Sequence, residues 1–583
     1  MSMTANENSV ATENSITPNE KTNIKVDTTI LKDEIEASVD MVSEECSEDA
    51  IDFSEKQQQF KLSDVRFIIL FTGLLLGFFM ATLDTTIIIT AAGIIASEFN
   101  AVDQIGWIGS AYLLTLSGFQ PVYCSITEII GQRISYSCCI LIFIFGSVLC
   151  GVSNSMMMLI ISRAVQGIGA AGLFTSVLII ICELMDSRTR AIYQGILGLA
   201  IGMATLIGPL LGGFLADRGQ WRWAFYVNIF VGAVIITLTL VFCKLPLTKK
   251  QKERINGEKT IWKQLTEVDY ASLVLLMPGA VSLLAGLQLG GERLSFTDPA
   301  VVALLTLGPA LIILFVVTEV FLIRFPIFPR HFVMSRSNIA ILACQFTGGM
   351  MNNAIMYFVP LHFQIVKNDN AVQSACKLLP FFVTAVVSGL LSGLIVQKTG
   401  YYRFLLWLGA AFCIVGSSLL QTSNLATPEY LLFIYLGLFG LGLGSIKNIT
   451  TVAGQAGIAK EDLTIATAHG QFMRIFGGAF GVNIAAVLFR YDTTTQLEHL
   501  KKVTRSDFNL SSIPALKSLH YMLRQRVEKI CLEALDKVYL LVAIVSGIAF
   551  ISTLLIKEYY IIVDSKTRTG DKSNVKEEEI KKV

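Results

Sequence analysis

Long apolar stretches recur along most of this 583-residue chain, and they constrain its fold more than any other feature. An α-helix needs about 20 apolar residues to cross the hydrocarbon core of a bilayer. The sequence predicts fourteen such helices, and the run from Ile465 is the least regular because Arg474 interrupts it. The expected helices begin near Arg66, Gly106, Ser135, Met156, Ala191, Trp223, Tyr270, Ala300, Asn338, Ala375, Phe404, Tyr430, Ile465 and Val538.

The composition indicates an integral membrane protein whose surroundings are a lipid bilayer. Apolar residues make up 53% of the chain and charged residues only 16%, whereas a soluble domain has about 25% charged residues. A net charge of +1 gives no sign of a nucleic-acid partner. The 11 cysteines are scattered through apolar runs without metal-ligand spacing, so we interpret them as small hydrophobic residues.

Motifs of enzymes and ATP-driven pumps are absent from the sequence. It has no phosphate-binding GxxxxGK[ST] loop, no zinc signature and no GxSxG motif. We therefore expect no enzymatic activity, no cofactor and no metal.

The basic residues predict the orientation of the chain. Cytosolic loops of membrane proteins are enriched in Lys and Arg, and the loop between residues 244 and 263 is the most basic short loop here. If this loop is cytosolic, an even number of spans leaves both termini in the cytosol. The first 62 residues are polar and acidic, so we expect a disordered cytosolic tail, either phosphorylated or without a defined role.

The same loop divides the fourteen stretches into six, two and six. This pattern predicts two six-helix bundles and a two-helix insert in an all-α membrane protein, with a substrate site at the midplane between the halves. The expected parts are a tail (1–62), an N-terminal bundle (63–246), the loop with its insert (247–335), a C-terminal bundle (336–560) and a cytosolic tail (561–583).

Two charged residues lie inside apolar stretches. Asp84 follows the middle of the first stretch, in FFMATLDTTIIITAAG, and Arg163 lies in the fourth, in LIISRAVQGIGAAGLF. At about 1.5 Å per residue, both lie roughly 10–14 Å from the outer ends of their helices, so we expect them to pair. Asp84 either titrates during transport or anchors neighbouring helices, and Arg163 either takes part in coupling or forms a structural ion pair. Thr85 and Thr86 can donate hydrogen bonds to Asp84 or to their own helix.

Polar residues in the ninth stretch, ACQFTGGMMNNAIMYFVPLHFQ, predict a lining for a cavity. Amides that face lipid are unfavourable, so these side chains either line a substrate cavity or bond between helices. The expected cavity residues are Gln345, Asn352, Asn353 and Tyr357, with Arg474 from a later stretch. Lys447 and Glu319 lie toward cytosolic helix ends, where long side chains reach the interface.

Several motifs together resemble the major facilitator superfamily, in its fungal fourteen-span drug:proton antiporter branch. They are LDTTIIITAA, RAVQGIGAAG, GMATLIGPLLGG and WRWAFYVNIFVG, and the likeness covers about residues 66–560. The resemblance places the acidic residue of the first span at Asp84 and the arginine of the fourth at Arg163. It assigns the packing and hinge motif of the fifth span to Gly208, Pro209, Gly212 and Gly213.

One motif departs from the family pattern. The loop after the second span reads CSITEIIGQR, where the family has Gly-x-Leu-x-Asp-x-x-Gly-Arg-Lys/Arg. Gly131 and Arg133 remain, while Glu128 replaces the aspartate that is thought to latch the cytosolic gate. The resemblance implies a latch formed by Glu128.

The resemblance also implies alternating access driven by protons, with Asp84 as the protonation site and Arg163 tuning it. We expect a monomeric antiporter in the plasma membrane that exports small amphipathic or toxic compounds, often cationic. The alternatives are a vacuolar transporter of basic amino acids and a non-transporting membrane sensor. The sequon NLS predicts that Asn509 is glycosylated and that residues 490–537 face the lumen or exterior.

Overall fold

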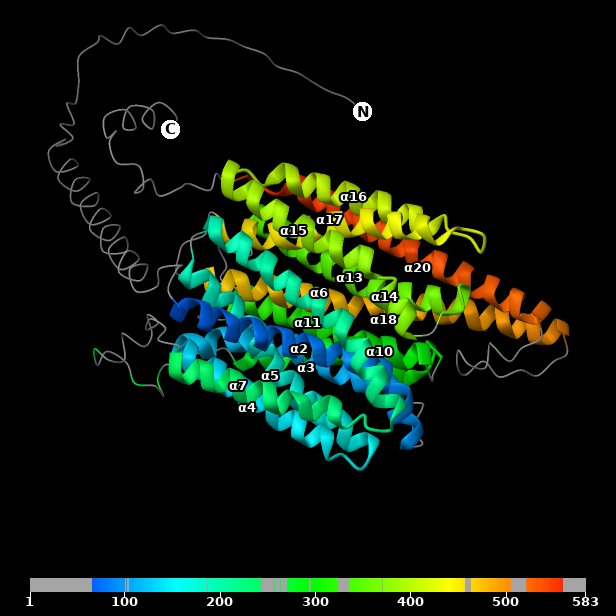
Figure 1. Ribbon diagram of the computed structural model, residues 1–583, viewed down its shortest axis with the longest axis horizontal. Helices are drawn as coiled ribbons and strands as arrows, with labels where there is room; N and C mark the ends of the chain where they lie inside the picture. The colour runs from blue at the N-terminus through cyan, green and yellow to red at the C-terminus, as the bar shows by residue number, and fades with distance from the viewer. Residues whose placement is uncertain are drawn as a thin grey trace, which may run out of the picture. The chain divides into compact units, whose positions relative to one another are not determined.

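The computed structural model describes residues 65–558 with gaps (Figure 1). The gaps are residues 100, 102–103, 186, 243–255, 257–259, 261–262, 264–269, 293–294, 323–334, 370, 457–462 and 505–520. The two expected tails lie outside the described residues. Regular structure in the described ranges is entirely helical, as the long apolar stretches predicted.

The first helices follow one another closely in the sequence. They are α2 (Val65–Glu98), α3 (Ile105–Ile130), α4 (Gln132–Gly151), α5 (Met156–Leu184), α6 (Ser187–Asp217) and α7 (Trp223–Phe242). After the basic loop come α10 (Tyr270–Glu292), α11 (Pro299–Val317) and the short π-helix η2 (Thr318–Leu322). Local signals define some starts: the Asp298 side chain accepts a hydrogen bond from the Ala300 N–H at 2.9 Å, and Pro299 occupies the first turn of α11.

The remaining helices run from residue 336 to residue 555. They are α13 (Arg336–Val366), α14 (Ala371–Cys376), α15 (Leu379–Thr399), α16 (Arg403–Gln421), α17 (Glu429–Gln455), α18 (Leu463–Thr504) and α20 (Tyr521–Leu555). Among the described residues, twelve helices are long and apolar enough to cross a membrane. The other two long helices are α3, with 26 residues, and α10, with 23.

All but one of the expected stretches begin within a few residues of an observed helix. The exception is the last, because α20 begins at Tyr521 rather than near Val538. In addition, α18 continues for 42 residues to Thr504. The end of α18 and the start of α20 are polar extensions with one apolar face. Leu500, Val527 and Cys531 on this face are buried together with Ile365. Charged residues such as Lys529 stay exposed. An apolar stripe on a polar helix stabilises it without a continuous apolar run.

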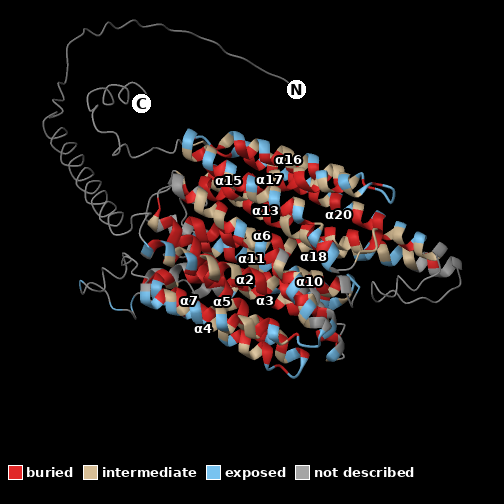
Figure 2. Ribbon diagram, in the orientation of Figure 1, coloured by how far each residue is buried: buried red, intermediate tan, exposed pale blue. Residues whose placement is uncertain are grey.

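The long helices pack in two groups. Helices α2–α7 contact one another, as do α13, α15–α18 and α20, while α10 and α11 form a pair. Contacts between the groups run from α6 to α15 and from α3 and α5 to α18 (Figure 1). Buried residues lie between the helices and exposed ones on the outer faces (Figure 2). Those outer faces carry large apolar side chains such as Phe145, Phe230 and Phe321, which suit contact with lipid.

Candidate functional site

A buried polar group surrounds Asp84 on α2. Its carboxylate forms an ion pair with Arg163 on α5, and both side chains are about 1% exposed. The other carboxylate oxygen, Oδ1, accepts hydrogen bonds from Gln166 Nε2 at 2.8 Å and from Asn228 Nδ2 at 2.9 Å. Helices α2, α5 and α7 therefore meet at one carboxylate.

Further contacts hold the guanidinium of Arg163 in place. Arg163 Nη1 also donates to Gln166 Oε1 at 2.6 Å, and Nε donates to the Ile108 carbonyl at 3.2 Å. The guanidinium carbon lies 4.3 Å from the ring centroid of Tyr112 on α3, a cation–π contact. A buried charge is tolerable only when it is paired and hydrogen-bonded in this way.

Sequence reasoning identified the centre of this group and missed its partners. The predicted pairing of Asp84 with Arg163 is confirmed. The two amides, Gln166 and Asn228, lie in the quoted motifs RAVQGIGAAG and WRWAFYVN. Their depth in the membrane alone did not show that they contact Asp84. The threonines bond to backbone instead of the carboxylate: Thr85 Oγ1 donates to the Thr82 carbonyl at 2.6 Å, and Thr86 Oγ1 to that of Ala204 at 3.1 Å.

The arrangement suits an ionised Asp84. The groups of Arg163, Gln166 and Asn228 that contact the carboxylate are all hydrogen-bond donors. A protonated carboxyl group would need an acceptor for its own hydrogen and would lose at least one of these bonds. Each donor is matched by a carboxylate oxygen of Asp84, so the carboxylate is fully hydrogen-bonded.

A central cavity of about 980 Å³ lies beside this polar group. Residues from both helix groups line it. Arg163 from α5 and Pro209 from α6 belong to the first group. The residues that the sequence predicted for a cavity all contribute to the lining: Gln345, Asn352, Asn353, Tyr357 and Arg474. The volume is at the upper end of the range for small-molecule pockets, roughly 300–1,000 Å³.

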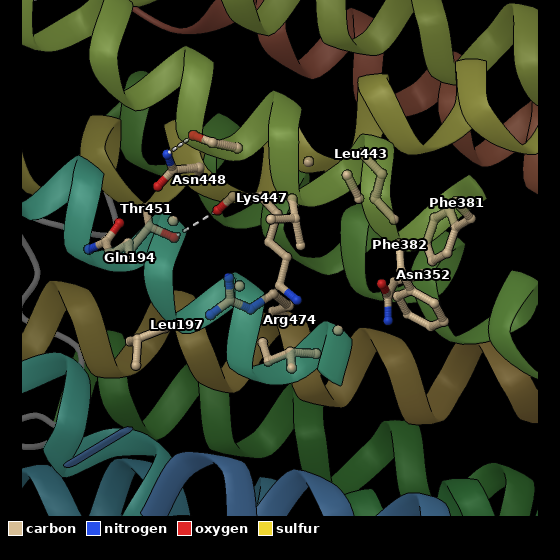
Figure 3. Close-up of a pocket in the computed structure, with 18 of the residues that line it drawn as sticks. Gln194, Leu197, Asn352, Phe381, Phe382, Leu443, Lys447, Asn448, Thr451 and Arg474 are labelled. Atoms are coloured by element: carbon tan, nitrogen blue, oxygen red, sulfur yellow. Dashed lines mark hydrogen bonds between the residues drawn. The ribbon is translucent and has the colours of Figure 1, made fainter. Parts of the chain in front are cut away.

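A second, smaller cavity of about 90 Å³ shares part of its wall with the first. Gln194 from α6, Asn352 from α13, Lys447 from α17 and Arg474 from α18 contribute to its lining (Figure 3). The expectation that Lys447 extends to the membrane interface is wrong, because this side chain lines both cavities. Glu319 is likewise buried, at 2% exposed. Both residues lie on faces that pack inside the protein, which their position along the sequence did not reveal.

Comparison with known proteins identifies the family. Residues 74–482 match the family model of the Major Facilitator Superfamily. The chain belongs to the major facilitator superfamily. It is 30% identical to an uncharacterised MFS-type transporter of Schizosaccharomyces pombe over 513 residues, covering 87% of this chain and 82% of the relative. It is 32% identical to the MFS-type efflux pump MFS1 of Arthroderma benhamiae, covering 73% of this chain and 79% of the pump.

The fold also matches solved structures of transporters. The human organic anion transporter MFSD10 superposes with a TM-score of 0.53 at 12% identity, covering 83% of this chain and all of that one. A likeness at this identity shows the fold alone. Together, the comparisons place this member of the superfamily in the fungal efflux-type branch. It is an integral membrane transporter of small molecules and not an enzyme.

The gating motifs of this transporter are described in part. Gly131 separates α3 from α4 with a φ of 95°, a conformation that favours glycine, and Arg133 donates to the Leu240 carbonyl on α7. The side chain of Glu128 lies outside the described residues, so its latch stays a prediction. The sequon at Asn509 also lies outside them.

The fifth-span motif lies on α6, where it approaches α2. A side chain at Gly208 would collide with Thr86, so this glycine permits the close approach. Pro209 lies inside the helix and lines the central cavity. The hinge role of Gly208, Pro209, Gly212 and Gly213 stays a prediction. No group of three His, Cys, Asp or Glu side chains suits a metal ion in the part of the chain that the structure describes.

Proposed function

We propose that this transporter is a proton-coupled antiporter that exports small amphipathic compounds by alternating access, working as a monomer in the plasma membrane. The observation that carries the proposal is the double position of Arg163. Its side chain lines the central cavity and also pairs with the buried carboxylate of Asp84. A change in the charge of Asp84 thus changes the electrostatic field at the cavity wall.

The coupling follows from the hydrogen bonds of Asp84. With Asp84 ionised, Arg163, Gln166 and Asn228 hold α2, α5 and α7 together around it. A proton on Asp84 weakens these bonds and frees the guanidinium to interact with cargo or water. The two conformations then differ in their affinity for protons and for cargo, which is what coupling requires.

The architecture that we propose has fourteen spans. Helix α3 has 26 residues and α10 has 23, so at about 1.5 Å per residue each is roughly 35–39 Å long and exceeds a hydrocarbon core of about 30 Å. Six spans then form each half (63–246 and 336–560), α10 and α11 form the insert (247–335), and the tails (1–62 and 561–583) are cytosolic.

The test is transport into sealed inside-out vesicles with an acidic lumen. Sulforhodamine B, which is anionic, and rhodamine 6G, which is cationic, serve as probes because they share one ring system. We expect at least one dye to accumulate in the lumen against its gradient, and a protonophore to abolish the accumulation. If neither dye accumulates, or if the protonophore has no effect, the proposal is wrong. Accumulation of lysine or arginine alone would favour the vacuolar amino acid transporter.

A further inference from the structure

Two basic side chains in the cavity walls have no acidic partner among the residues that the structure describes. Lys447 on α17 and Arg474 on α18 line both the central cavity and the smaller one. Figure 3 shows the two side chains extending toward the same space from their two helices. Among the residues that the structure describes, neither side chain takes part in an ion pair or a hydrogen bond.

The other charged residues that line these cavities take part in ion pairs. Arg163 pairs with Asp84. Asp369 lines the central cavity and pairs at 2.7 Å with Lys377, which also pairs with Glu429 at 2.7 Å. Lys447 and Arg474 are therefore the charged lining residues that have no ion pair among the residues that the structure describes. An unpaired charge inside a membrane protein is unfavourable and usually marks a site for an oppositely charged group.

The surroundings of the two cations resemble a site for an amphipathic molecule. Both side-chain amide atoms of Gln194 are buried without a hydrogen-bond partner in the described structure, and Gln194 lines the smaller cavity. The apolar rings of Phe381 and Phe382 line the same smaller cavity (Figure 3). Cations and an amide donor suit an anionic head group, while the rings suit an apolar body.

We propose that the cargo is an amphipathic organic anion whose carboxylate or sulfonate binds between Lys447 and Arg474. This inference rests on the proposed function and specifies its substrate class. It revises the expectation that the cargo is often cationic, because the basic side chains of Lys447 and Arg474 line the cavities. It also disfavours basic amino acids, because Asp369, the carboxylate among the described lining residues, already has a lysine partner.

The test is equilibrium binding to the purified full-length protein in a non-ionic detergent, followed by fluorescence polarisation. The probes are sulforhodamine B and rhodamine 6G. We expect the anion to bind at least tenfold more tightly, and Lys447→Gln and Arg474→Gln each to weaken it about tenfold, since each removes a charge-assisted bond. The affinity for rhodamine 6G should stay unchanged or rise in both variants. Lys398→Gln is the matched control, because it removes a lysine that is exposed at the end of α15.

Binding and transport separate the two proposals. Equal or tighter binding of rhodamine 6G, binding of neither dye, or losses no larger than that of Lys398→Gln would overturn the anion site. A protein that binds the anion as expected but shows no accumulation of either dye in acidic vesicles would keep the site and refute the antiporter. Accumulation of rhodamine 6G alone would keep the antiporter and refute the site.

Discussion

The guanidinium of Arg163 on α5 contacts both the carboxylate of Asp84 on α2 and the ring of Tyr112 on α3. The same side chain lines the central cavity. A buried ion pair is a poor source of net stability, because removing both ions from water offsets much of their attraction. The position of Arg163 at the cavity wall is what the proposed coupling role requires.

Close packing between α2 and α6 predicts the effect of a single methyl group. We expect Gly208→Ala to lower the free energy of unfolding by about 1–3 kcal/mol, because the new Cβ would collide with Thr86. The matched control is Gly198→Ala on the same helix, where no atom lies within 4 Å of the added carbon. It should be neutral or stabilising by up to about 1 kcal/mol. Thermal unfolding of both variants in detergent checks this, and equal melting temperatures would contradict it.

Glu98 predicts a pH dependence of stability. Its carboxylate accepts hydrogen bonds from the Trp221 indole at 2.6 Å and from Arg222 at 3.0 Å. These bonds, chiefly that from Trp221, hold the pKa of Glu98 below its ordinary value of 4.5. A carboxylate with a lowered pKa stabilises the fold above its unfolded pKa, and this contribution is lost as the pH falls through the folded pKa.

We therefore expect Glu98→Gln to lower the melting temperature at pH 7. The difference from the unsubstituted protein should shrink as the pH falls below about 4.5 and through the lowered pKa of Glu98 in the folded protein, where Glu98 becomes protonated as well. Melting curves across this range measure it. A difference that stays constant from pH 7 to about pH 3 would show that the charge of Glu98 is not what Trp221 and Arg222 stabilise.

The sequon at Asn509 tests the number of spans. If fourteen helices cross the membrane from a cytosolic N-terminus, residues 490–537 face the lumen or exterior and Asn509 is accessible to glycosylation. We expect a glycosidase to increase the electrophoretic mobility of the protein, and Asn509→Gln to remove this effect. Cytosolic labelling of a tag in this region would show that the count is wrong.

Sequence reasoning predicted the helices well because each apolar stretch of about 20 residues has few other ways to fold in a membrane. It failed where helices continue without such a stretch, as in α18 to Thr504 and α20 from Tyr521. There an apolar stripe on one face is enough, and the surrounding polar residues conceal it.

The candidate site could be predicted only in part. Asp84 and Arg163 stand out because a charge in an apolar run is conspicuous, and their depths indicate that they meet. Asn228 comes from a helix far along the chain, and its approach to Asp84 depends on how α7 packs against α2. The position of Lys447 depends on the rotation of α17, which the weak periodicity of a membrane helix does not define.

The most direct test of proton coupling is uphill dye transport by Asp84→Asn in vesicles with an acidic lumen, normalised to the amount of protein in the membrane. Asparagine keeps the shape of the side chain and removes its titration. Asp492→Asn is a control, because Asp492 pairs with Lys537 in the helical extensions and does not line either cavity. We expect Asp84→Asn to reach the membrane in near-normal amounts and to lose accumulation against the gradient, while Asp492→Asn keeps it. Loss of Asp84→Asn from the membrane would indicate a structural ion pair instead, and full uphill transport by this variant would contradict the coupling role of Asp84.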